Sequence, residues 1–181
     1  MYEHSLKVPL VFQGPGIPAN VRNEALTYLI DIYPTLCDLT HAKTPSLVEG
    51  ISLAPLLKGE KNTHRKSMIY AYKNNQRAFR QGDYKLIKYL VDGNRNNQLF
   101  NIKEDDPWEM NNLYGQEEYK KVVSELEEQM QEALREAGDE VILKAQDWAV
   151  AEIPKWIDKV SQETIDWLRD LAERERNLRG F

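Results

Sequence analysis

Apolar and polar residues alternate most regularly in the middle of the chain. The strand-like runs there cover residues 67–73, 76–81, 84–91 and 97–102. Short groups of Asn, Gly and Asp separate them, and these residues tolerate the positive φ of tight turns. Alternation in the first run places Met68 and Tyr70 on one face and Ile69 on the other. We therefore predict a four-stranded antiparallel meander with one face covered by a helix.

Two more strands are expected near the start of the chain. Residues 8–12 form an apolar run that a cluster of Gly and Pro ends at residues 14–18, and residues 24–29 have the composition of a second strand. A buried strand at residues 8–12 needs a neighbour on each side, and the seven residues before it are too few to supply one. We therefore expect the chain to be the back part of a larger protein.

A helix and a short helix are expected between these strands and the meander. Asp31 occupies a position typical of a helix cap, and Pro34 follows in the first turn, where its missing amide costs nothing. We read Asp31 as this cap rather than as a metal ligand, and Cys37 as a filler of the core behind it. A short helix is predicted around residues 53–57, ended by Gly59.

From Gln116 the spacing of apolar residues changes to steps of three and four. This spacing predicts one long amphipathic helix, which Gly138 ends. Further helices are expected after Gly138. The predicted fold class is α+β, organised as a remnant of a large α/β domain in residues 1–60, a subdomain with the antiparallel sheet and long helix in 61–137, and a helical extension in 138–181.

Composition excludes several classes of function. The 181 residues carry a net charge of −5 and no basic stripe with interleaved aromatics, which argues against a nucleic-acid partner. Cys37 is the only cysteine, so neither a disulfide framework nor a thiolate zinc site can be built. No apolar run approaches the roughly 20 residues of a membrane span.

The order of motifs from Tyr2 to Leu113 resembles the C-terminal part of the sulfatase family, in the alkaline phosphatase superfamily. The matching pieces are Tyr2-Glu3-His4-Ser5, Val8-Pro9, Pro15-Gly16, Asp31-Ile32-Tyr33-Pro34-Thr35-Leu36, Glu49-Gly50, Ser52-Leu53-Ala54-Pro55-Leu56-Leu57, Gly59, Tyr84-Lys85-Leu86-Ile87, Leu99-Phe100-Asn101-Ile102, Asp106-Pro107-Trp108-Glu109 and Asn111-Asn112-Leu113. The resemblance implies hydrolysis of a sulfated saccharide or aryl sulfate by the complete enzyme, and a periplasmic or secreted location.

The resemblance also implies chemistry that this sequence does not carry. Sulfatases use a formylglycine made from a Cys or Ser in a Cys/Ser-x-Pro-x-Arg motif, together with a divalent ion, usually calcium. Cys37 is followed by Asp38-Leu39-Thr40, so it is not that residue, and the two metal-binding motifs are absent. We therefore predict no catalytic and no metal-binding residue in this chain, an N-terminal catalytic half as its partner, and no turnover by the chain alone.

The candidate substrate-binding residues are His4, Gln76 and Arg77. An imidazole at His4 suits a sulfate or a sugar hydroxyl, because the resemblance places this segment at the cleft; the alternative is a histidine that satisfies loop backbone groups. Gln76 and Arg77 begin the second strand of the meander, where a guanidinium can grip an anion in bidentate fashion. The alternative for Arg77 is an ordinary solvated edge.

The other polar candidates have structural explanations. The acidic run before Trp108 and Glu109 suits a turn better than a metal site. His41 stands where a glycine often closes a helix, and His64 has no partner within reach along the sequence. Two alternatives remain open for the function: a phosphodiester or phosphonate hydrolase of the same superfamily, and a non-catalytic interaction module that binds a partner through its sheet and tail helices.

Overall fold

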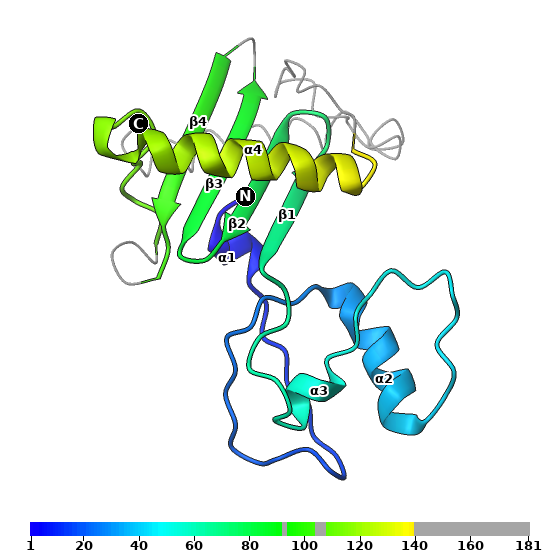
Figure 1. Ribbon diagram of the computed structural model, residues 1–181. Helices are drawn as coiled ribbons and strands as arrows, with labels where there is room; N and C mark the ends of the chain where they lie inside the picture. Colours follow the sequence, from blue (N-terminus) through cyan, green and yellow to red (C-terminus); the bar gives the residue numbers. More distant parts are fainter. Residues whose placement is uncertain (92–93, 104–107, 140–181) are drawn as a thin grey trace, which may run out of the picture. The chain divides into compact units, whose positions relative to one another are not determined.

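The computed structural model describes residues 1–91, 94–103 and 108–139, which belong to one compact unit, Met1–Ala145. Its centre is an antiparallel sheet in the order β1-β2-β3-β4 (Figure 1). The strands are β1 (Ser67–Tyr72), β2 (Gln76–Gln81), β3 (Tyr84–Val91) and β4 (Asn94–Asn101). The predicted meander is therefore confirmed. β4 begins three residues earlier than predicted, because its polar first residues pair through their backbone with β3 up to Val91.

One face of the sheet is covered by the long helix α4 (Lys120–Glu136) (Figure 1). The buried core between helix and sheet consists of Phe79, Leu86, Leu99, Leu113, Leu126 and Met130. A single 3-10 turn, η2 (Glu117–Tyr119), leads into the helix, and Gly138 follows it with a φ of +69°. The predicted helix and its glycine stop are therefore confirmed.

The start of the chain packs on the other face of the sheet. Ala78, Ile87, Phe100 and Ile102 form a second buried cluster, against which Met1, Tyr2, Tyr70 and Tyr89 pack. The first helix, α1 (Glu3–Leu6), follows directly after Tyr2. Tyr70 lies in this second cluster, whereas Ile69 packs under α4, so the predicted alternation of β1 is confirmed.

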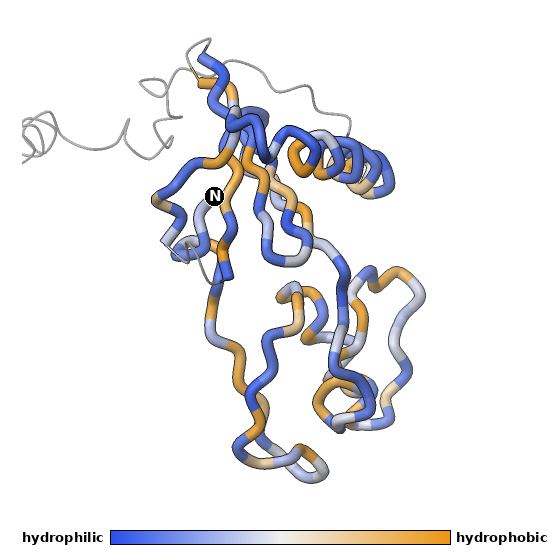
Figure 2. The backbone as a smooth tube through the Cα atoms, turned by 60° about the vertical axis from the view of Figure 1, so that its left-hand side comes forward, coloured by the Kyte–Doolittle hydropathy of each residue, from blue (hydrophilic) through white to orange (hydrophobic). Residues whose placement is uncertain are grey.

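The two strands predicted before the meander are wrong. Residues 8–12 form no strand, and Val8 and Val11 are 51% and 85% exposed. Figure 2 shows the segment that follows α1 as an extended, largely hydrophobic stretch of chain. Residues 24–29 contribute only an isolated bridge between Leu26 and Arg65. An apolar run becomes a strand only where another strand accepts its hydrogen bonds, and the described residues supply no neighbour for residues 8–12.

The expected helices between residues 29 and 60 are present. They are η1 (Leu29–Asp31), α2 (Ile32–Thr40) and α3 (Ala54–Leu57). His41 ends α2 with a φ of 58°, in the left-handed conformation that glycine usually takes, and Cys37 is buried as predicted. Among the described residues no helix is long and apolar enough to cross a membrane. The helices predicted after Gly138 lie outside the described residues.

Candidate substrate-facing site on the first helix

Glu3 anchors α1 to the sheet through two cations. Lys85, the second residue of β3, donates from Nζ to Oε1 of Glu3 at 3.0 Å. Arg80, in β2, donates from Nη1 to Oε2 at 3.1 Å. The side chain of Lys85 is fully buried. A lysine without access to water needs a carboxylate partner, so this contact fixes where Glu3 lies.

Glu109 completes the buried ionic cluster from the loop that follows β4. Its Oε1 lies 2.5 Å from Nζ of Lys85 and makes no hydrogen bond to any other described group, while its Oε2 accepts the backbone N–H of Glu3 at 2.5 Å. Glu109 has a φ of 57°, a conformation unusual for a residue with a side chain. With Arg80 included, two cations face two carboxylates, so the buried cluster is electrically neutral.

His4 is held in place by its neighbour Tyr2. The Tyr2 hydroxyl donates to Oε1 of Gln98, in β4, at 3.0 Å. The rings of Tyr2 and His4 stack with their centroids 5.8 Å apart and their planes 13° from parallel. His4 itself is exposed. The result is an exposed imidazole on a turn whose two preceding residues are both bonded to the sheet.

Tyr70 lies beside Glu3 and Arg80 on the same face of the sheet. Burial raises the pKa of Tyr70 to about 12, although the guanidinium of Arg80 opposes the shift. The Tyr70 hydroxyl therefore stays protonated at neutral pH and adds no negative charge to the ionic cluster. The Nε of Arg80 is buried and has no hydrogen-bond partner among the described residues.

Asp31 is the centre of a second buried network. Its oxygens accept backbone N–H groups from Tyr28 at 2.9 Å and Ile51 at 2.8 Å, and the Nη2 of Arg65 at 2.5 Å. Burial alone would raise the pKa of this carboxyl, but the hydrogen bonds from Arg65 and from the two backbone groups outweigh burial and lower it. His64 is also in contact, with its Nε2 3.2 Å from Oδ2 of Asp31.

Asp31 therefore occupies the N-cap position of α2, as predicted, but its side chain does not cap this helix. Its side chain makes no capping hydrogen bond to α2 and instead closes the preceding turn, η1, and ties the loop at Ile51 to Arg65. His64 does have a partner, which sequence reasoning missed because 33 residues separate it from Asp31. The explanation of Asp31 as structural, rather than metal-binding, agrees with these contacts.

The structure places Arg77 away from His4. Consecutive side chains of β2 point to opposite faces of the sheet. Ala78 lies in the cluster against which Tyr2 packs, so Arg77 faces α4. Its Nε and Nη2 donate to Asp139 at 2.6 Å and 3.1 Å. Arg77 is 3% exposed and is thus not a solvated edge residue. Gln76 is half-buried and, two positions before Ala78 in β2, lies on the same face of the sheet as Ala78.

The described residues offer no site for calcium. Among them no group of three or more His, Cys, Asp or Glu side chains is arranged to hold a metal ion. The buried carboxylates of Glu3, Glu109 and Asp31 are already compensated by lysine, arginine and backbone N–H groups. The donor set of this part of the chain therefore does not fit a divalent cation.

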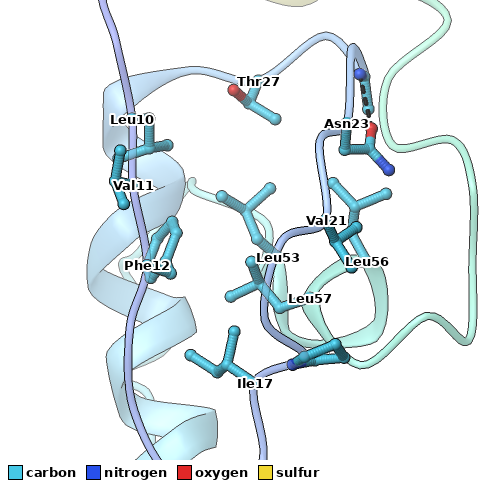
Figure 3. Close-up of a pocket in the computed structure, with 12 residues that line it drawn as sticks. Leu10, Val11, Phe12, Ile17, Val21, Asn23, Thr27, Leu53, Leu56 and Leu57 are labelled. Atoms are coloured by element: carbon cyan, nitrogen blue, oxygen red, sulfur yellow. Dashed lines mark hydrogen bonds between the residues drawn. The ribbon is translucent and has the colours of Figure 1, made fainter.

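A separate cavity of about 230 Å³ lies against α3 (Figure 3). Its lining is largely aliphatic and aromatic, with Leu10, Phe12 and Ile17 facing Leu53 and Leu57. Such a lining offers no cationic group for a sulfate.

Lys85 and Glu109 are the functional-site residues that sequence reasoning missed. Lys85 lies between apolar residues in a strand, and its neighbour at the next position on the same face is Ile87. A charged residue on the apolar face of a strand signals a buried ionic partner. The sequence carries this signal at Lys85, but the signal does not identify the partner residue.

Comparison with known proteins gives the family. The model for the C-terminal region of N-sulphoglucosamine sulphohydrolase matches residues 1–136. N-acetylglucosamine-6-O-sulfatase from Bacteroides thetaiotaomicron is 31% identical over 151 residues, covering 77% of this chain and 27% of that protein. Delta 4,5-hexuronate-2-O-sulfatase from the same organism is 36% identical over 135 residues, covering 68% of this chain and 27% of that protein.

A solved structure of a 2-O GAG sulfatase has a TM-score of 0.62 and 31% identity, covering 75% of this chain and 32% of that one. The chain spans about a quarter of the length of the two curated relatives. The chain therefore belongs to the sulfatase family and is a C-terminal portion of the N-sulphoglucosamine sulphohydrolase type.

Proposed function

We propose that the complete protein hydrolyses sulfate esters of a saccharide, and that this chain forms part of the wall of its substrate cleft. The observation that carries the proposal is the family match over residues 1–136, which includes the motif Tyr2-Glu3-His4-Ser5. The two relatives are sulfatases of N-acetylglucosamine and of hexuronate. Their shared chemistry is a sulfate ester on a sugar ring, and this is the substrate class we propose.

The reacting groups come from another part of the protein. Hydrolysis of a sulfate monoester needs an aligned nucleophile, a cation at the developing charge and a donor to the leaving oxygen. Cys37 is buried in α2 and lacks the motif that would convert it to formylglycine. Calcium and formylglycine belong to the complete enzyme, since the described residues fit neither. The isolated chain is inactive.

His4 is the proposed substrate contact in this chain. Its imidazole is exposed, and the carboxylate of Glu3 beside it is neutralised by Lys85 and Arg80 and does not repel an anion. An imidazole N–H can donate to a sulfate oxygen or a sugar hydroxyl. Gln76 shares a sheet face with Ala78 and is kept as a second proposed contact. Arg77 faces α4 and is bound to Asp139, so it would meet an anion only at a separate place from His4.

The test is steady-state sulfate release by the complete protein from a panel of 6-O-sulfated glucosamine, 2-O-sulfated hexuronate and an aryl sulfate. The variant His4→Asn should lower kcat/KM for the saccharides by about tenfold, the effect of losing one hydrogen bond to a charged group. His41→Asn is the matched control, because His41 is exposed on α2 and Asn tolerates its positive φ. Equal activity of His4→Asn and wild type would remove His4 from the site.

Two other functions are separated by measurements on the same proteins. A phosphodiester or phosphonate hydrolase would turn over an aryl phosphate diester faster than the aryl sulfate. An interaction module would be a stable monomer as the isolated chain. The exposed apolar side chains of Val11, Val21, Leu29 and Leu47 favour the view that other parts of the sulfatase cover this surface. We accordingly expect the isolated chain to self-associate.

A further inference from the structure

We propose that Lys85 and Glu109 are positioning residues of the substrate site, which act by fixing the turn that presents His4. This inference rests on the proposed function, because it assumes that His4 contacts the sulfated substrate. Neither residue touches the exposed imidazole. Both act through Glu3, the residue immediately before it.

The first step is the rigidity of the ionic cluster. Lys85 is fully buried and the side chain of Glu109 is 1% exposed, so neither group can exchange its partner for water. A buried ion pair keeps one geometry because every alternative leaves an uncompensated charge in a medium of low polarity. Lys85 bonds to both Glu3 and Glu109. The position of Glu3 is therefore determined by the sheet rather than by the flexible chain around it.

The second step is the connection from Glu3 to His4. Glu109 accepts the backbone N–H of Glu3, so Glu109 holds the main chain of this residue while Lys85 and Arg80 hold its side chain. On the other flank, Gln98 holds the Tyr2 hydroxyl, and the Tyr2 ring stacks on His4. The turn is thus bonded at both residues that precede His4. Supporting contacts of this kind orient a binding side chain and commonly change activity by tenfold or more.

The same strand provides a control for the loss of a lysine charge. Lys88 pairs with Glu127 at 2.9 Å on the α4 side of the sheet, with the two side chains 27% and 29% exposed. Lys88→Met removes the same charge from the same strand as Lys85→Met. It has no connection to α1 or to His4.

The kinetic test uses the complete protein and the sulfated saccharide that it hydrolyses fastest. Lys85→Met should lower kcat/KM by up to about tenfold, which is no more than His4→Asn does, and Lys88→Met should lower it by less than about twofold. If Lys85 acts through His4, the kcat/KM of the double variant His4→Asn/Lys85→Met should lie within about threefold of the kcat/KM of His4→Asn. The losses of the two single variants would then not be additive. Full additivity of the two losses would overturn the proposal.

The second readout needs no turnover. In NMR spectra of the histidine-labelled complete protein, the imidazole signals of the three histidines of this chain are assigned by replacing each of them in turn with Asn. Lys85→Met should shift the His4 signals and leave those of His41 and His64 in place, and Lys88→Met should shift none. If Lys85→Met does not fold, Glu3→Gln replaces it, because this variant keeps the shape of the side chain and removes one charge.

The two proposals fail in different ways. A complete protein that releases no sulfate from any substrate contradicts the proposed function, while the His4 signals still decide whether Lys85 positions this residue. Unchanged His4 signals in both Lys85→Met and Glu3→Gln overturn the positioning role, whatever the activity.

Discussion

Lys85 and Glu109 form a salt bridge of 2.5 Å between Nζ and Oε1, and both side chains are shut off from solvent. Lys85 comes from the start of β3 and Glu109 from the loop before α4, and the two meet at Glu3 on α1. Three motifs that are far apart in the sequence thus converge on one buried cluster. The motifs that identify this family therefore supply the ionic cluster that stabilises this part of the fold. Of the two titratable residues on α1, Glu3 belongs to this cluster, and His4 is exposed and can face a ligand.

Removal of Glu109 should be strongly destabilising. Glu109→Ala leaves Lys85 with Glu3 as its remaining carboxylate and leaves the N–H of Glu3 without its acceptor. Breaking a buried pair costs about 3–5 kcal/mol. The free energy of unfolding, measured by urea denaturation, should fall by that amount. Glu127→Ala is the control, since its partly exposed pair with Lys88 contributes about 0–1 kcal/mol. Similar losses in the two variants would show that the buried cluster has no special role.

Asp31 should make the protein sensitive to acid. The hydrogen bonds to Arg65 and two backbone groups lower the pKa of Asp31 in the folded state despite its burial, whereas the unfolded state has the ordinary value of about 3.9. The stabilisation is therefore fully present above about pH 4 and is lost as the pH falls through the lower folded value. The stability difference between wild type and Asp31→Asn should shrink over that range. A difference that stays constant on acidification would contradict this assignment.

Tyr70 should limit stability at high pH. Burial raises its folded pKa to about 12, against an ordinary value of about 10 in the unfolded chain. The stabilisation is present below pH 10 and is lost as the pH rises from about 10 to about 12, because the unfolded state then releases the proton first. Tyr70→Phe should flatten the decline in unfolding free energy over this interval. Parallel declines in the two proteins would contradict the shift.

Gly50 should tolerate no side chain. A Cβ at this position would overlap the carbonyl oxygen of Ile30 and press on the ring of Pro34. Because the first neighbour is the backbone of Ile30 in η1, relief requires the loop to move away from η1 and α2, at a cost of about 1–3 kcal/mol. Thermal unfolding of Gly50→Ala should show this loss. Gly14→Ala is the control, with ordinary contact distances at its Cβ. An unchanged Tm for Gly50→Ala would contradict the close packing of this loop on α2.

The sheet was predictable because its signals are local. Alternation in β1 and β3 and the turn residues between the strands lie within a few positions of each other, and the bounds of β2 and β3 follow from them. Residues 8–12 carry an equally good local pattern, yet they are not a strand, since a strand also needs a hydrogen-bonding neighbour that no local pattern reports. Asp31 was read as a cap for the same reason: Arg65 and Ile51 are too distant in sequence to be foreseen as its partners.

The candidate site was only half predictable. His4 was found from a motif, and the structure shows it exposed. Its supports were not found, because the contacts of Glu3 with Lys85 and Glu109 span 82 and 106 residues. A buried lysine in a strand indicates that a carboxylate partner exists but does not identify that partner. Arg77 was predicted to bind an anionic ligand, and in the structure it forms a salt bridge with Asp139 of the same chain.

The most direct test compares sulfate release from 6-O-sulfated glucosamine by the complete protein and by the isolated 181-residue chain, both supplied with calcium. We predict release by the complete protein and none by the chain, because the proposed function places the nucleophile and the metal ligands in another part of the protein. Sustained release by the purified chain alone, with contaminating enzyme excluded, would contradict the account.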